Sequence, residues 1–125
     1  ALAMEAYFAA VDWWKENPEE GNAIIANAIK FSVPDVEKVI GKDGSIHKGG
    51  IWIFSREQAG RFMGLIPGDL PLGLSNGQIQ DHWKTTNEWW IKFGQVKEMH
   101  EWTEGIVTEP LAKVLEKSGY KVSAP

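Results

Sequence analysis

The sequence predicts a mainly α-helical protein with about six helices and one short extended segment near residues 51–54. Apolar residues recur at helical spacing along most of the chain. Pro, Ser and Asn stand where these patterns begin, and Gly stands where several of them end. No repeat, low-complexity tract or interior linker interrupts the patterns, so we expect a single domain over residues 1–125.

The longest helical pattern spans residues 75–94. Ser75 and Asn76 are suitable N-cap residues, and Gly94 suits the left-handed position that ends many helices. One stripe of this helix is apolar: Ile79, Trp83, Trp90 and Phe93. Because three of the seven tryptophans lie in this segment, we expect it to anchor the core.

Three helices are predicted before it, over residues 2–17, 18–30 and 34–40. In the first, the residues expected to face inward are Met4, Tyr7, Phe8, Val11 and Trp14. In the second, the expected apolar face is Ala23, Ile24, Ile25, Ala28 and Ile29, and in the third it is Val36, Val39 and Ile40. Asn17-Pro18 and Ser32-Val33-Pro34 are the start signals that separate them.

The middle and end of the chain hold the less regular segments. Residues 51–54 read as a buried extended connector, with a strand as the alternative. A capping box at residues 55–58 starts a helix that runs to about residue 63, and the apolar residues 65–74 are expected to lie irregularly against the body. Residues 95–102 form a loop or one further turn, and a last helix follows Thr108 and closes at residues 118–119.

The composition excludes several classes of protein. Hydrophobic residues at 43% and charged residues at 24% are values of a globular protein, and the net charge of −4 gives no basic surface for nucleic acid. No apolar run is long enough for a transmembrane segment. Cysteine is absent, which excludes disulfides and thiolate chemistry.

No catalytic or metal-binding pattern is present, so we expect no enzyme, no metal and no cofactor. The sequence lacks a nucleophile elbow and a glycine-rich phosphate loop. The histidines His47, His82 and His100 are far apart in sequence. His100 lies among glutamates, and this cluster has two interpretations, a metal site or a set of exposed charges on a solvated face. We favour the solvated face.

The seven tryptophans have three interpretations. They can fill a core, form a stacking platform for a ligand, or cover a surface that contacts a partner protein. Composition alone leaves all three open.

The order of the signals resembles the C-terminal third of periplasmic substrate-binding proteins of the nitrate, sulfonate and taurine type, whose relatives bind pyrimidine precursors of thiamine. The segments that carry the resemblance are Trp13–Glu20 (WWKENPEE), Asp35-Val36, Phe54–Glu57 (FSRE), Trp89–Gly94 (WWIKFG) and Ile106–Leu111 (IVTEPL). The resemblance covers nearly the whole chain through motifs that are individually common.

The resemblance implies a solute-binding component of an ABC importer, or a piece of one, for a small organic anion or related nutrient. It implies a fragment or truncation of a two-lobed protein, a periplasmic or extracytoplasmic location, and a permease partner. For the ligand-binding residues we expect Trp52, Trp89 and Trp90, because an aromatic wall suits an apolar tail or ring of a ligand. We expect no signal peptide in the sequence itself. Apolar helix faces without their lobe would favour a homo-oligomer. The alternative function is a freestanding helical interaction module that uses a Trp-rich surface.

Overall fold

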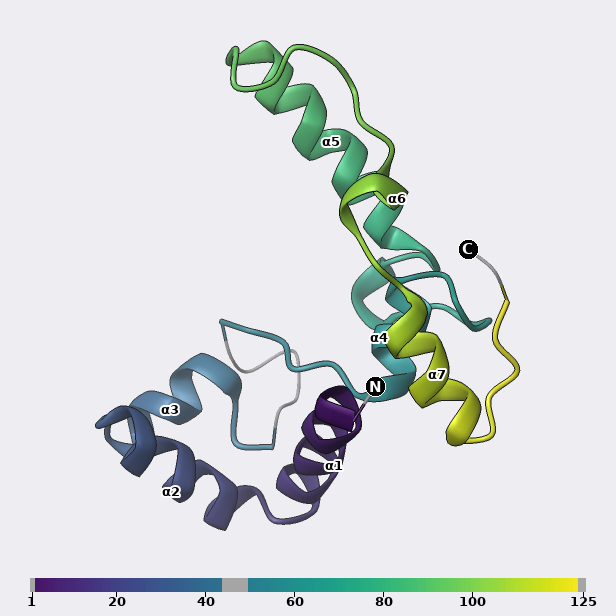
Figure 1. Cartoon of the computed structure of the whole chain (residues 1–125). Coiled ribbons are helices and arrows are strands. Elements are labelled where there is room, and N and C mark those ends of the chain that lie inside the picture. Colours follow the sequence, from purple (N-terminus) through teal and green to yellow (C-terminus); the bar gives the residue numbers. More distant parts are fainter. Residues whose placement is uncertain (1, 44–49, 124–125) are drawn as a thin grey trace. The chain divides into compact units, whose positions relative to one another are not determined.

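The computed structural model describes residues 2–43 and 50–123, and it divides them into two compact units, residues 2–55 and 56–123, each considered by itself (Figure 1). The helices are α1 (Leu2–Glu16), α2 (Pro18–Ile29), α3 (Val33–Ile40), α4 (Arg56–Phe62), η1 (Pro71–Gly73), α5 (Gln78–Lys92), α6 (Trp102–Gly105) and α7 (Glu109–Lys117). The described ranges contain no strand, and the prediction of a mainly α-helical protein is confirmed. The single domain over residues 1–125 stays a prediction.

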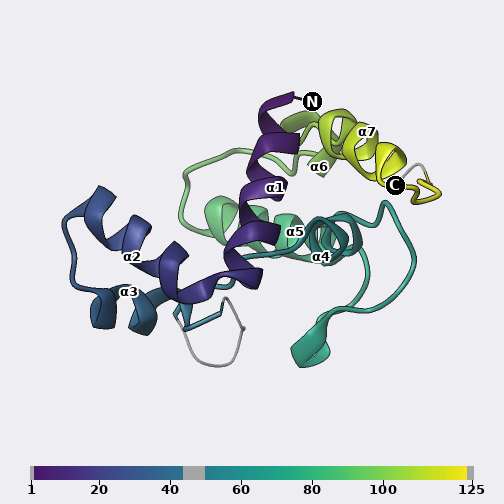
Figure 2. The same cartoon turned by 90° about the horizontal axis from the view of Figure 1, so that it is seen from below.

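In the first unit α2 packs against both of its neighbours, α1 and α3 (Figure 1, Figure 2). Pro18 opens α2 directly after α1 ends, as its fixed φ and missing N–H allow at a first helical position. Ser32 caps α3, its hydroxyl accepting from the Asp35 N–H at 3.3 Å. The buried apolar side chains of this unit are Phe8, Val11, Trp14, Ala26 and Val36.

A buried network of hydrogen bonds connects these helices. The Trp14 indole Nε1 donates to Asn22 Oδ1 at 2.8 Å. Asn22 Nδ2 donates in turn to the carbonyls of Gly41 and Lys42, at 3.3 and 3.1 Å. Asn22 is 0% exposed, and its bonds satisfy the polar atoms that burial removes from water. The indole lies against Gly21, where an added Cβ would stand 2.2 Å from Trp14 Cδ1.

The predicted apolar face of α2 is wrong. Ile24 and Ile29 are 54% and 51% exposed, whereas the buried residues of α2 are Gly21, Asn22 and Ala26. The small Gly21 and the hydrogen-bonding Asn22 fit the Trp14 ring better than branched side chains would, and this rotates the helix away from its most hydrophobic side. In α1, Phe8, Val11 and Trp14 are buried as predicted, but Tyr7 is exposed, and so is Val39 in α3.

In the second unit α4 crosses α7 at a glycine. A Cβ on Gly60 would lie 2.9 Å from Leu115 Cδ1 and 3.1 Å from the Ile66 side chain, so the missing side chain permits the contact. The expectation that residues 65–74 lie against the body holds only in part, because Leu65, Ile66 and Leu70 are buried whereas Leu72 is 71% exposed. The core comprises Leu65, Ile66, Leu70, Leu111, Val114 and Leu115.

The prediction that residues 75–94 anchor the core is wrong. Helix α5 begins at Gln78, extends away from α4 and α7 (Figure 1), and packs chiefly on the short helix α6. Its buried residue is Asn87, while Trp90 and Phe93 of the predicted stripe are 51% and 65% exposed. Helical spacing identified the stripe, but too little of the unit lies beside α5 to cover it.

The ends of the helices agree with the predictions more closely than their buried faces do. The exception is the start of α5, where Gly77 is the N-cap and the predicted caps Ser75 and Asn76 precede it. Gly94 has the predicted left-handed φ of +70°, and α7 ends before Ser118. The undecided residues 95–102 contain no helix before Trp102, where α6 begins, and the sequence did not predict this short helix. Residues 51–54 adopt neither helix nor strand, and they are less buried than predicted because Ile51 is exposed and the other three are half-buried.

Candidate functional site

A cavity of the second unit lies beside α4 and has a volume of about 650 Å³. Its walls come from α4, from the loop that follows α4, from the turn before α5 and from the segment after α7. The lining residues are Glu57, Arg61, Gly64, Ile66, Pro67, Asn76, Gly119, Tyr120, Lys121 and Ser123. A volume of this size falls within the range of small-molecule sites.

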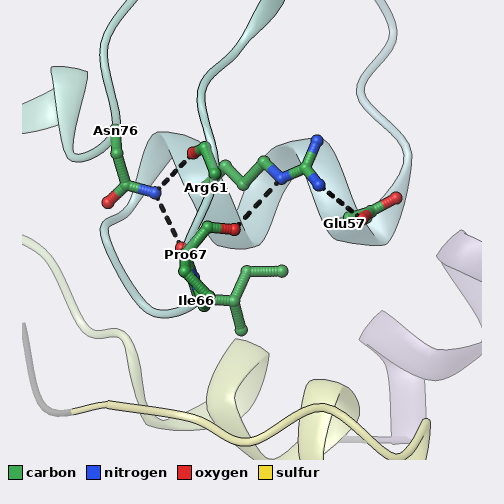
Figure 3. Close-up of polar contacts among 6 residues, drawn as sticks. Glu57, Arg61, Ile66, Pro67 and Asn76 are labelled. Carbon is green, nitrogen blue, oxygen red and sulfur yellow. Dashed lines mark hydrogen bonds and ion pairs between the residues drawn. The ribbon is translucent and has the colours of Figure 1, made fainter.

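Arg61 is the most firmly held charged group in this cavity (Figure 3). Its Nη2 pairs with Glu57 Oε1 at 2.7 Å, one turn back on α4, and its Nε donates to the Pro67 carbonyl at 3.3 Å. Gly68 makes the second contact possible, since a Cβ there would lie 2.7 Å from Arg61 Nε. Gly68 also has a φ of +107°, which a side chain would strain. The guanidinium is therefore fixed between a carboxylate and the loop backbone.

The loop that follows α4 is fixed by one amide. Asn76 Nδ2 donates to the carbonyls of both Ile66 and Gly68, each at 2.7 Å (Figure 3). The Arg61 carbonyl accepts from the Gly77 N–H at 2.8 Å, which ties the end of the same loop to α4. These bonds give the cavity a preformed shape and a polar rim.

The charge of the cavity is positive. Arg61 and Lys121 contribute two positive charges, and Glu57 contributes one negative charge. Within the described part of the chain, neither Arg61 Nη1 nor the Lys121 ammonium has a hydrogen-bond partner. Arginine carries five N–H donors, and the two bonds described leave donors for a ligand. A net positive cavity in a chain of net charge −4 is suited to an anion.

The three tryptophans predicted to bind a ligand line none of this cavity. Trp52 belongs to the first unit, where it meets Phe54 edge to face with ring centroids 4.4 Å apart. Trp89 stacks on Phe93 at 5.5 Å, and Lys92 Nζ lies 4.8 Å from the centroid of its ring. Trp90 lines a second cavity, on α5. Their role in ligand binding stays a prediction.

The histidines offer no metal centre in the described residues. No group of three His, Cys, Asp or Glu side chains there could hold a metal ion. His100 Nδ1 lies 3.0 Å from Glu104 Oε2, and this hydrogen bond is the main reason that the pKa of Glu104 is lowered. His47 lies outside the described residues.

Sequence reasoning missed Arg61, Asn76 and Lys121. A signal for Arg61 was present, because Glu57 and Arg61 have the i,i+4 spacing of a helical ion pair. The glycines at 64, 68 and 77 also marked a loop with close backbone approach. Lys121 carries no such signal, since it stands in a polar tail that reaches the cavity only through tertiary contacts, among them the bond from the Ser123 N–H to the Leu65 carbonyl at 2.8 Å.

The chain matches no known protein family, no curated protein and no solved structure at a significant level. Among the described helices, none has the length and apolar character needed to cross a membrane.

Proposed function

We propose that this chain binds a small organic anion in the Arg61 cavity and serves as the solute-binding component, or a piece of one, of an ABC importer. The observation that carries the proposal is the positive charge of a preformed cavity in an acidic chain. The transport role and the extracytoplasmic location rest on the resemblance in the order of the sequence motifs.

The cavity favours an anion with one negative charge. A carboxylate or sulfonate accepts two N–H groups of a guanidinium side by side, which the donors left on Arg61 can supply. Lys121 adds a second positive charge from the segment after α7. Glu57 holds the guanidinium in place and repels a second negative charge on the ligand, so monoanions are expected to bind more tightly than dianions of the same size.

The test is isothermal titration calorimetry of the chain with benzenesulfonate, with butyrate and with succinate, the last two being a monoanion and a dianion of similar size. Replacing Lys121 with Gln removes one exposed charge from the cavity, and it should weaken binding of a monoanion about fivefold. Lys97→Gln is the matched control, because it removes the same charge from an exposed position of the same unit outside the cavity. Equal losses in both variants, or no binding by any anion, would contradict the proposal.

The variant Arg61→Lys provides a second test of the proposed anion site. Lysine keeps the positive charge but lacks the planar fork of donors. Binding of a monoanion should fall in Arg61→Lys by more than in Lys121→Gln, and circular dichroism should first confirm that the variant is folded, because Arg61 also holds the loop at Pro67.

A further inference from the structure

A second cavity, independent of the Arg61 cavity, lies between α5 and α6 and has a volume of about 330 Å³. Two indole rings and several oxygen acceptors converge on it. The lining residues are Trp83, Thr86, Asn87, Trp90, Val96, His100, Glu104 and Gly105.

The Trp83 wall is rigid. Its indole Nε1 donates to the His100 carbonyl at 2.7 Å. Gly105 lies flat against the same ring, where a Cβ would stand 2.3 Å from Cη2, so the ring cannot rotate without displacing α6. Trp90 stands two turns further along α5 and is 51% exposed, which leaves its aromatic surface open to a ligand.

The polar groups of this cavity are mostly acceptors. Glu104 is held on α6 by His100 Nδ1 and by the Glu101 backbone N–H, at 3.0 and 3.4 Å. Asn87 is 5% exposed, and its Nδ2 donates to the Trp83 carbonyl at 3.0 Å. Its Oδ1 can therefore accept a hydrogen bond from a ligand. No lysine or arginine lines the cavity in the described part of the chain.

We propose that this cavity binds a compact organic cation of the substituted-ammonium class. The electron-rich faces of two indoles attract a cation, and the attraction is largest for tryptophan among the aromatic residues. The Glu104 carboxylate supplies the opposite charge beside them. The site goes beyond the proposed anion-binding function, because its charge has the opposite sign and it shares no lining residue with the Arg61 cavity.

The experiment compares choline with its neutral isostere 3,3-dimethylbutan-1-ol by calorimetry and tryptophan fluorescence. The two probes have nearly the same shape and differ in charge. Choline should bind at least tenfold more tightly. Equal affinities would show that the cavity only accepts apolar groups, and an absence of saturable choline binding would also overturn the proposal.

Two neighbouring residues provide a matched pair of variants. Trp89 and Trp90 are consecutive and each 51% exposed, but Trp90 lines the cavity and Trp89 does not. Trp90→Ala should weaken choline binding tenfold or more, whereas Trp89→Ala should leave it unchanged. Glu104→Gln should weaken choline but not the isostere. Equal effects of the two tryptophan variants would refute the assignment.

Discussion

Replacing Gly21 with Ala tests how the first unit is packed. In an exposed helix interior this change stabilises, because alanine is favoured over glycine by about 1 kcal/mol. Here the new Cβ would lie 2.2 Å from Trp14 Cδ1 and 3.1 Å from Trp14 Cγ, distances that real Cβ atoms avoid. The obstacle is a ring that is only 6% exposed and is held by its hydrogen bond to Asn22.

The expected loss of stability follows from two effects. Overpacking of a core costs roughly 1–3 kcal/mol. If the indole moves, Asn22 loses its bond from Trp14 Nε1, and an unsatisfied buried polar group costs about 1–3 kcal/mol. Subtracting the gain in helix propensity of about 1 kcal/mol leaves a net destabilisation of roughly 1–5 kcal/mol.

Urea denaturation followed by circular dichroism measures this change. Trp14→Phe, which removes part of the ring, provides the second half of a double-mutant cycle, and Gly21→Ala should cost less in that background. A stabilised Gly21→Ala protein, or costs that simply add in the double variant, would show that Trp14 does not lie on Gly21.

Three further predictions concern other parts of the chain. Lys30 ends α2 with a left-handed φ of +61°, so Lys30→Gly should raise the free energy of unfolding in urea by about 1 kcal/mol. The pKa of Glu104 lies below its ordinary value, chiefly because of the hydrogen bond between Glu104 and His100. The stabilisation of α6 by the Glu104 carboxylate should therefore be complete above the ordinary pKa and be lost as the pH falls through the lowered pKa. A carboxyl NMR titration of Glu104 with an ordinary midpoint would contradict this. The exposed Ile24 and Ile29 should support self-association, so light scattering should show mass rising with concentration and Ile24→Lys should suppress it; a monomer at all concentrations would refute the expectation.

Only part of the candidate site could be predicted from the sequence. The Glu57–Arg61 spacing was visible, because an i,i+4 pair is fixed by helix geometry alone. Asn76 and Lys121 could not be assigned to the same place from the sequence. They reach the Arg61 cavity because a loop folds back on α4 and because the segment after α7 pairs with Leu65. Trp89 and Trp90 are neighbours in sequence, yet Trp90 lines the cavity between α5 and α6 and Trp89 does not.

The sequence by itself determined the helical class and most helix limits. Proline, serine caps and left-handed glycines act on the backbone within a few residues, so their effect does not depend on distant partners. Only the tertiary structure decided which faces are buried. In α2 the bulkier Ile24 and Ile29 stay exposed because Gly21 and Asn22 fit the Trp14 ring, and in α5 the apolar stripe stays largely uncovered because few elements lie beside it. Burial depends on the shape and hydrogen bonds of a partner surface, which hydrophobic periodicity does not describe.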